Sequence, residues 1–375
     1  MEDNFRILIF TNVFGGLYYF RKELVEEIAK KYSLICALPY DERFNWFAEI
    51  GCKSVSVDLR RRGMNVFSDV LLLFRYILII KRHKPSLVLT YTIKPNLYGG
   101  IASIIFNVPF ICNITGIGTS IYRPSIFSRI LLAIYNFVLR HSSFTFFQNQ
   151  DNLRLLGQRL KEKRIYLLPG SGVNLKNHKL EEYPSVGPIN FLFVGRIMQD
   201  KGIDEFIDAA IILKNKYMAD LEFFIVGPME EERYSEKIES AHKDGILSFY
   251  GFQKNVIDFY KVSHAVINTS YHEGMSNVLL EAAATGRPVL ASNVPGCREA
   301  FDEGISGFGF EPRSVDSLVQ AIERFIALPH EQKAAMGLAG RKKMEREFDR
   351  QIVVDAYMRE IENILEENEK KDKKK

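Results

Sequence analysis

The fold is decided by a stretch in the second half of the chain, Ile189–Gly202, which reads INFLFVGRIMQDKG. Five of its first six residues are apolar, and such a short continuous run predicts a strand buried on both faces of a sheet. Gly195 ends the predicted strand, and Arg196 and Lys201 follow on the loop. Parallel sheets bind ligands beyond the carboxyl ends of their strands, so we expect chemistry on this loop.

The same pattern continues through the second half of the chain. Helical patterns fit between the predicted strands, as at Asp204–Lys216 and Ser276–Thr285. This alternation predicts a parallel sheet covered by helices on both faces. The further strand-like runs are Leu221–Gly227, Ile246–Gly251, His264–Ser270 and Arg287–Asn293.

The first half carries a second series of the same kind. It opens with the strand-like run FRILIFT, the pair Gly15-Gly16, which predicts a tight loop, and an amphipathic helix. Further strand candidates are Tyr32–Pro39, Ser54–Leu59, Ser86–Thr92, Pro109–Thr115, Phe144–Asn149 and Arg164–Gly172. We therefore expect two doubly wound α/β domains. Their predicted bounds are 1–173 for the first domain, 174–188 for a linker, 189–350 for the second domain, 351–368 for a helix returning to the first domain, and 369–375 for a disordered basic tail.

Length and composition set the class of protein. The chain has 375 residues, of which 47% are apolar and 26% charged, which suits two domains with cores of their own and argues against wholesale disorder. Its four scattered cysteines form no CxxC pair, so we expect neither disulfides nor a cysteine metal site. The acidic start with its short apolar run predicts no secretion signal, and hence a cytoplasmic protein.

Charge is unevenly distributed along the chain. Residues 1–187 hold 25 Lys and Arg against 14 Asp and Glu, whereas residues 188–375 hold 25 against 32. Between Arg60 and Arg140 there are 11 basic residues and a single acid, Asp69. A basic half implies an anionic partner, such as nucleic acid, a phosphorylated substrate or a membrane surface. The basic residues alternate with aliphatic runs rather than with stacking aromatics, so we expect no nucleic acid.

The loop after Ile189–Val194 is the first candidate site. Arg196 offers a planar fork of donors and Lys201 a compact charge, and two fixed cations at a strand end suit a diphosphate. The alternative is a solvated loop that carries two ordinary surface charges.

The second candidate site is the stretch YHEGMSNVLLEAAATGRPVL, which follows the predicted strand His264–Ser270. Gly274 permits a tight turn, and Ser276 suits the N-cap of a helix whose free N–H groups and positive dipole end favour an anion. Glu281 falls inside this helix among Leu and Ala residues, where its carboxylate could accept hydrogen bonds from ribose hydroxyls. The alternative for Glu281 is a charge on the helix surface.

Taken together and in their order along the chain, the motifs resemble those of a known family, the retaining glycosyltransferases of family 4, which have the GT-B fold. The resemblance rests on GR…KG at 195–202, a strand ending in Gly227-Pro228, FYGF at 249–252 and Glu-x7-Glu at 273–281. In the first half, FGGLYYFRKEL, TIKPNLYGG and NITGIGT are similar to members that build bacterial capsule, O-antigen, lipopolysaccharide or glycan chains on a polyprenyl-diphosphate carrier. The resemblance covers nearly the whole chain.

The resemblance implies a role for each matching residue. Arg196, Lys201 and Glu273 would be catalytic, with the two cations on the donor diphosphate and Glu273 on the donor sugar. Glu281 would bind the ribose, and Phe252 would flank the base. The donor would be a UDP-sugar carrying a hexose or an N-acetylhexosamine. The other donor-binding residues would be Gly16, Gly195, Gly274, Met275, Ser276, Asn277 and Val278.

Two positions depart from the family pattern. Where many members carry His or Asp near the reacting carbon, this chain has Asn113 and Thr115, neither of which is a useful general base near neutral pH. Asn174 replaces a carboxylate before the linker, which changes only turn chemistry. We expect the leaving phosphate to help deprotonate the acceptor hydroxyl. No Asp-x-Asp ends a predicted strand, so we expect no obligatory metal and no cofactor.

The basic half suggests how the chain meets a polyprenyl-diphosphate-linked acceptor. Two basic segments, 60–84 and 125–141, contain apolar runs that are shorter than the about 20 residues that span a bilayer. We expect them to cover the sheet and also to contact an anionic membrane, which gives peripheral attachment to the inner face of the cytoplasmic membrane. Lys94, Asn113 and Thr115 are the expected acceptor-side residues, although Lys94 is equally explained as a surface lysine before a turn proline.

Two other functions stay open from the sequence. One is a GT-B enzyme that acts on a soluble sugar phosphate, or a nucleotide-sugar epimerase. The Glu-x7-Glu spacing favours transfer, and the apolar-basic runs favour a lipid-linked acceptor. The other is a non-enzymatic nucleotide-sugar-binding module, which the intact set Arg196, Lys201, Glu273 and Glu281 argues against.

Overall fold

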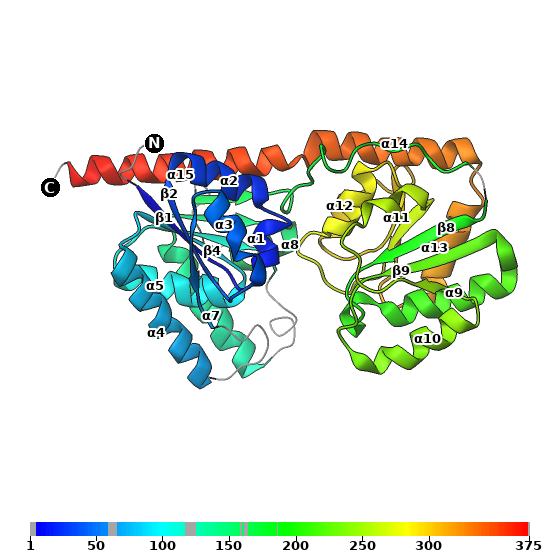
Figure 1. Cartoon of the computed structure of the whole chain (residues 1–375), viewed down its shortest axis with the longest axis horizontal. Helices are drawn as coiled ribbons and strands as arrows, with labels where there is room; N and C mark the ends of the chain where they lie inside the picture. Colours follow the sequence, from blue (N-terminus) through cyan, green and yellow to red (C-terminus); the bar gives the residue numbers. More distant parts are fainter. Residues whose placement is uncertain are drawn as a thin grey trace. The chain divides into compact units, whose positions relative to one another are not determined.

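The chain forms two compact units, each built around its own sheet (Figure 1). The computed structural model describes residues 5–58, 66–116, 125–157, 160, 164–185 and 187–373. Unit 1 consists of Met1–Ser171 with Gln351–Lys375, and unit 2 of Gly172–Arg350. The chain therefore leaves unit 1 once and returns to it once.

Unit 1 contains a seven-stranded parallel sheet in the order β3-β2-β1-β4-β5-β6-β7. The central strands are apolar almost throughout because helices cover both of their faces. The order reverses between β1 and β4, so this is the switch point of the sheet. The strands are β1 Arg6–Phe10, β2 Ser33–Leu38, β3 Lys53–Ser56, β4 Leu87–Tyr91, β5 Phe110–Ile114, β6 Phe144–Phe147 and β7 Ile165–Leu167.

Two helical layers enclose this sheet. The first layer, formed by α1, α2, α3 and α15, packs one apolar cluster, and the second, formed by α4, η2, α5 and α7, packs another. A capping box at Ser125 and Ser128 begins α7. The helices are α1 Phe14–Tyr18, α2 Lys22–Lys31, η1 Glu42–Phe44, α3 Asn45–Glu49, α4 Val66–His83, η2 Pro95–Gly99, α5 Gly100–Ile105, α7 Ile126–His141, α8 Gln150–Gly157 and α15 Arg350–Asp372. Within the described ranges, no helix combines the length and apolar character needed to cross a bilayer.

Unit 2 contains a six-stranded parallel sheet in the order β10-β9-β8-β11-β12-β13, with its switch point between β8 and β11. Its strands are β8 Ile189–Val194, β9 Leu221–Val226, β10 Ser248–Phe249, β11 Ala265–Asn268, β12 Val289–Ser292 and β13 Gly307–Phe310. Both units thus have the doubly wound α/β architecture that the sequence predicts.

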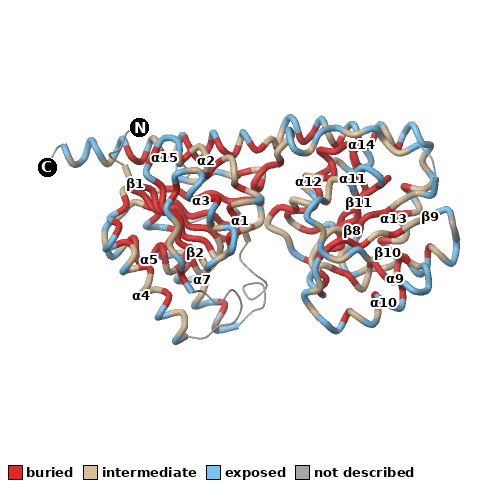
Figure 2. Tube along the Cα trace, in the orientation of Figure 1, coloured by how far each residue is buried: buried red, intermediate tan, exposed pale blue. Residues whose placement is uncertain are grey.

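Helices also cover both faces of the unit 2 sheet. One apolar cluster lies under α9, α10 and α13, and the other under α11, α12 and the end of α14. Figure 2 shows the buried residues gathered along the strands of each unit. The helices are η4 Gln199–Lys201, α9 Ile203–Tyr217, η5 Met218–Asp220, η6 Glu232–Tyr234, α10 Ser235–Lys243, α11 Ile257–Val262, α12 Asn277–Ala284, η7 Arg298–Ala300, α13 Val315–Ile326 and α14 His330–Glu347.

The two ends of unit 2 meet in the fold. Val173 and Asp349 form a parallel bridge, and the Arg350 N–H donates to the Val173 carbonyl at 3.1 Å. Beyond this point α15 supplies eight apolar side chains to the core of unit 1, namely Val353, Val354, Ala356, Tyr357, Met358, Ile361, Ile364 and Leu365. The first unit in the sequence is therefore completed by residues that follow the whole of unit 2.

Two details differ from the predictions. Gly15 and Gly16 lie inside the short helix α1 rather than in a tight loop, because Phe14 and Leu17 on either side of them are buried and hold the turn. The basic tail predicted to be disordered from residue 369 is helical as far as Asp372. Glu366 pairs with Lys370 and Glu369 with Lys373, both four residues apart, and such pairs support a helix end.

Candidate functional site

The candidate site of unit 2 lies at the switch point of its sheet. Arg196 and Lys201 follow β8, and Glu273 follows β11, the neighbouring strand on the other side of the switch. Ligands of open parallel sheets bind at this place, beyond the carboxyl ends of the strands. The two loops that the sequence predicts as candidate sites therefore lie at the same edge of one sheet.

Lys201 and Glu273 form the centre of this site. The Lys201 ammonium donates to Glu273 Oε1, and the Ser270 hydroxyl donates to the same oxygen at 2.9 Å. Both charged side chains are mostly buried, with 22% and 15% of their area exposed. A partly desolvated ion pair of this kind holds each charge in a defined place.

The Arg196 guanidinium follows β8 at the same edge of the sheet, and one of its nitrogens is available to a ligand. Its Nη1 is 3.5 Å from Glu230 Oε1, yet the geometry makes no hydrogen bond, and this buried nitrogen has no hydrogen-bond partner among the described residues. A buried guanidinium N–H without an acceptor is costly, so this position is suited to an anionic ligand. Gly195, between β8 and Arg196, donates its own N–H to the Val226 carbonyl at 2.9 Å.

Two glycines fix the loops around the ion pair. Gly202 has φ +65°, and a Cβ there would come within 2.2 Å of the Thr269 carbonyl oxygen. The Thr269 hydroxyl in turn donates to the Lys201 carbonyl at 2.7 Å. Gly296 has φ +81°, and a Cβ would come within 2.8 Å of the carbonyls of both Glu273 and Gly274. The backbone on each side of Lys201 and Glu273 therefore packs without room for a side chain.

The segment Gly274–Val278 leads into α12. Ser276 occupies the N-cap position, as predicted, but its hydroxyl makes no cap hydrogen bond. Instead Asn268 Nδ2 donates to Ser276 Oγ at 3.0 Å, because β11 ends directly beneath the turn. The Ser276 N–H donates to the Gly296 carbonyl at 2.7 Å. Met275 and Ser276 are buried, whereas Gly274, Asn277 and Val278 are partly exposed.

Glu281 lies on α12 with part of its surface exposed. The buried Tyr260 hydroxyl donates to Glu281 Oε2 at 3.0 Å. Removal from water raises the pKa of Glu281 to about 7, although the Tyr260 hydrogen bond and the Arg350 charge act in the opposite direction. Glu281 is predicted from the sequence and Tyr260 is not, because nothing in the α11 pattern distinguishes this tyrosine from a core residue.

Phe252 stands on the segment that follows β10, with 61% of its surface exposed. Gly251 before it has φ +62°, and its carbonyl accepts from the Gly227 N–H at 2.8 Å, which attaches this segment to the end of β9. The aromatic ring is therefore presented to solvent from an anchored turn.

The acceptor-side candidates and Gly16 belong to unit 1. The Gly16 carbonyl accepts from Arg21 Nη1 at 3.0 Å. Lys94 donates to Asp69 Oδ1 at 2.8 Å, so the lysine pairs with the one acid of the basic stretch. Thr115 follows β5 and is partly exposed.

Asn113, the remaining acceptor-side candidate, is buried at the end of β5. Its Nδ2 donates to the Tyr357 hydroxyl, and its carbonyl accepts from Asn96 Nδ2 at 2.8 Å. The Oδ1 atoms of Asn12 and Asn113 and the Thr92 hydroxyl are buried at this edge without a hydrogen-bond partner among the described residues. These oxygens could receive hydroxyl donors from a ligand. In the same described ranges, no three His, Cys, Asp or Glu side chains gather as a metal site requires.

Comparison with known proteins is consistent across both units. The family model of the glycosyl transferase 4-like proteins matches residues 6–149, and that of the glycosyl transferases group 1 matches residues 177–343. The Campylobacter jejuni N,N'-diacetylbacillosaminyl-diphospho-undecaprenol alpha-1,3-N-acetylgalactosaminyltransferase is 21% identical, covering 96% of this chain and 99% of that protein. The Staphylococcus aureus capsular polysaccharide biosynthesis glycosyltransferase CapM is 26% identical, covering 83% of this chain and 85% of CapM.

Solved structures show the same architecture. Anabaena HepE, in complex with UDP and glucose, superposes with a TM-score of 0.77 at 18% identity, covering 96% of this chain and 100% of HepE. Sucrose-phosphate synthase from Thermosynechococcus elongatus superposes with a TM-score of 0.79 at 17% identity, covering 96% and 99%. Two doubly wound domains that match these structures define the GT-B fold class, which confirms the predicted fold. The chain belongs to the group 1 and 4-like glycosyltransferases, and the predicted family resemblance is confirmed.

Proposed function

We propose that this glycosyltransferase moves a hexose or N-acetylhexosamine from a UDP-sugar to a lipid-linked saccharide, with retention of the anomeric configuration and without an obligatory metal. The observation that carries the proposal is the Lys201–Glu273 ion pair at the switch point of unit 2, together with the Arg196 Nη1, which has no hydrogen-bond partner in the part of the chain that the structure describes. Two cations and a positioned carboxylate at this edge suit a diphosphate-linked sugar. That HepE was solved with UDP and glucose supports the same donor class.

The chemistry requires charge neutralisation more than a protein base. In the proposed step, the acceptor hydroxyl attacks the anomeric carbon from the face where the diphosphate departs. The bond from the anomeric carbon to the phosphate oxygen breaks, and the hydroxyl proton passes to the departing phosphate. Arg196 and Lys201 stabilise the charge that develops on the diphosphate, and such preorganised electrostatic terms are usually the largest in catalysis. Glu273 contacts the sugar, and Glu281 accepts from the ribose.

The lipid-linked acceptor rests on the relatives and on the surface of unit 1. The Campylobacter relative and an Escherichia coli galactosyltransferase that is 24% identical over 70% of this chain are both named for diphospho-undecaprenol acceptors. At the carboxyl edge of the unit 1 sheet, the oxygens of Asn12, Thr92 and Asn113 that no described residue hydrogen-bonds suit a hydroxylated ligand. We place the acceptor saccharide there, and Lys94 and Thr115 stay proposed acceptor-side residues.

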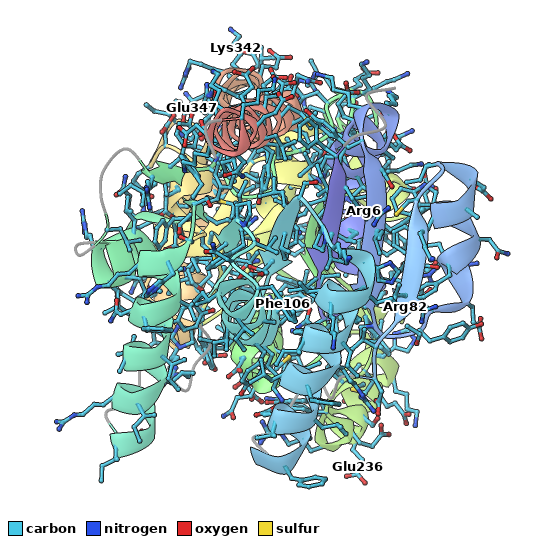
Figure 3. All side chains as sticks on the ribbon, turned by 90° about the vertical axis from the view of Figure 1, so that its left-hand side faces the viewer. Arg6, Arg82, Phe106, Glu236, Lys342 and Glu347 are labelled. Carbon is cyan, nitrogen blue, oxygen red and sulfur yellow. The ribbon has the colours of Figure 1, made fainter. Side chains whose placement is uncertain are left out.

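We further propose that α4 and α7 rest on an anionic membrane, at the inner face of the cytoplasmic membrane. Both helices pack on η2 and α5 over the same face of the sheet, and Figure 3 shows their side chains projecting away from it. Basic residues flank the apolar positions, as lipid phosphates require. The exposed apolar side chains are Phe67, Val70, Leu71, Phe74 and Leu78 on α4, and Ile126, Ile130, Ile134 and Phe137 on α7. The basic residues 60–62 of the predicted surface lie outside the described residues.

A thermal-shift panel tests the donor. UDP and UDP-sugars should raise the melting temperature with and without EDTA, whereas GDP and ADP should not. A ligand at a hundredfold excess over its dissociation constant adds about 2.7 kcal/mol of stability. Incubation with a short-chain prenyl-diphosphate saccharide and a UDP-sugar should then give a product whose new linkage keeps the donor's anomeric configuration by NMR. Turnover with a soluble sugar phosphate alone would favour the soluble-acceptor enzyme, and inversion or loss of activity in EDTA would contradict the mechanism.

Changing the apolar face should release the chain from membranes. Phe67→Asp combined with Phe74→Asp places two negative charges among the exposed apolar side chains of α4, and we expect at least about a tenfold loss of binding to vesicles that contain phosphatidylglycerol. Ile211→Asp combined with Ile212→Asp on α9 of unit 2 is the matched control, because these side chains are also exposed. Flotation is the measurement. Equal binding of both double variants would show that α4 does not meet the bilayer.

A further inference from the structure

Tyr260 is a buried side chain whose hydroxyl donates to a carboxylate of the candidate site. It lies on α11, is completely removed from solvent, and donates to Glu281 Oε2 at 3.0 Å. The two residues are 21 positions apart and come from different helices. The hydrogen bond therefore depends on how α11 packs beside α12, and it fixes one oxygen of the Glu281 carboxylate.

The backbone of Tyr260 is itself held in place by Arg287. This fully buried arginine donates from Nε to the Tyr260 carbonyl at 2.7 Å. Its other nitrogens donate to the carbonyls of Glu181, Glu182, Lys261 and Gly286. A guanidinium that satisfies five carbonyls joins the start of unit 2, α11 and the end of α12 into one rigid group. Arg287 thus fixes the backbone of α11 at Tyr260, from which the side chain reaches Glu281.

The remaining charged groups around Glu281 are few. The Arg350 guanidinium favours the ionised carboxylate. The His178 ring lies 6.3 Å from that of Tyr260, and burial lowers its pKa to about 4, so it stays neutral near pH 7. Arg341 on α14 donates to the Ala284 carbonyl at the end of α12 and pairs with Glu345. Tyr260 is thus the one described neighbour that hydrogen-bonds to the carboxylate directly.

We infer that Tyr260 is a positioning residue for donor binding: it holds the Glu281 carboxylate in the orientation that faces the ribose. The inference rests on the proposed function, since it deepens the role given there to Glu281. With one oxygen fixed by Tyr260, the other is left for the ligand. A carboxylate accepts two vicinal hydroxyls well only when its plane is set beforehand.

The role proposed for Glu281 and Tyr260 predicts how donor affinity depends on pH. Because the pKa of Glu281 is raised to about 7, the carboxylate is half protonated near neutral pH. Ribose hydroxyls donate to the ionised form, so donor affinity should rise with pH up to about 7 and then level off. Below that midpoint, affinity should fall about tenfold for each pH unit. The Tyr260 hydrogen bond stabilises the charged form, so removing it should move the midpoint upward.

Tyr260→Phe is the test, with donor KM and kcat measured across this pH range. A UDP-sugar is used rather than UDP, because a terminal phosphate titrates at about 6 and would confuse the profile. We expect the midpoint to rise by about one pH unit and donor KM at pH 7 to rise by about fivefold, with kcat nearly unchanged. Tyr217→Phe is the matched control, since Tyr217 donates to Glu323 at 3.2 Å elsewhere in unit 2. It should shift neither quantity.

Glu281→Gln distinguishes the ribose-binding role of Glu281 from the positioning role of Tyr260. If this variant binds the UDP-sugar as tightly as the wild type, the ribose role in the proposed function is wrong. If Glu281→Gln weakens binding but Tyr260→Phe keeps the wild-type midpoint and KM, only the positioning role is wrong. A purely structural effect of Tyr260→Phe would lower the melting temperature and the active fraction without moving the midpoint, and that result also overturns the inference.

Discussion

Lys201→Ala is expected to lower the turnover number by about a hundredfold, equivalent to about 2.7 kcal/mol of transition-state stabilisation. The lysine is mostly buried and bonded to Glu273, so its charge is placed in advance of the reaction. Removing it takes away the cation that meets the departing diphosphate and the ammonium group that Glu273 binds. Initial rates with a UDP-sugar and a lipid-linked acceptor measure the effect.

Lys214→Ala is the matched control for this experiment. Lys214 is also a mostly buried lysine of unit 2, paired with Glu222 at 3.2 Å, but Glu222 stands at the amino end of β9, away from the carboxyl ends of the strands. We expect its turnover to stay within about twofold of the wild type. Should Lys201→Ala behave like Lys214→Ala, the diphosphate does not bind at the end of β8.

Gly202→Ala should strongly destabilise unit 2. The new Cβ would stand 2.2 Å from the Thr269 carbonyl oxygen, and the residue would have to keep φ +65°. Backbone cannot yield as a flexible side chain can, so we expect a loss of about 3 kcal/mol or more in the free energy of unfolding. Because Thr269 also holds the Lys201 carbonyl, the same change should displace the lysine. Chemical and thermal unfolding give the measurement.

Gly245→Ala separates steric clash from backbone strain. Gly245 has φ +70°, much like Gly202, but nothing lies within 4 Å of the position its Cβ would take. This control should therefore show only the conformational cost of a left-handed alanine, about 1 kcal/mol. Equal losses in the two variants would mean that the Thr269 contact relaxes freely.

Much of the fold can be predicted from the sequence because strand burial leaves a local pattern. Continuous apolar runs such as Leu87–Tyr91 and Phe110–Ile114 are typical of strands covered on both faces, and both are central strands of the sheet. The helix around Gly15 and Gly16 could not be predicted, since glycine pairs favour loops and only tertiary packing makes this turn helical.

The candidate site divides in the same way. Its loops are predictable because chemistry in such sheets follows strand ends, which places Arg196, Lys201 and Glu273 at one edge. The partners of these residues are not predictable from spacing. Glu281 meets Tyr260, and Ser276 meets Asn268, through contacts between separate elements. The partner of Lys94 is an exception, because Asp69 is the single acid between Arg60 and Arg140 and this acid is the one that Lys94 binds.

The late return of the chain to unit 1 has a consequence for its biosynthesis. The core of unit 1 needs α15, whose residues are made only after all of unit 2 has been synthesised. Unit 2 is one continuous segment whose ends meet at the Val173–Asp349 bridge, so its own sheet needs no strand from unit 1. Domains usually fold in the order of translation. Here unit 1 cannot be completed in that order, and until α15 packs, the apolar face of unit 1 that α15 covers stays exposed to water.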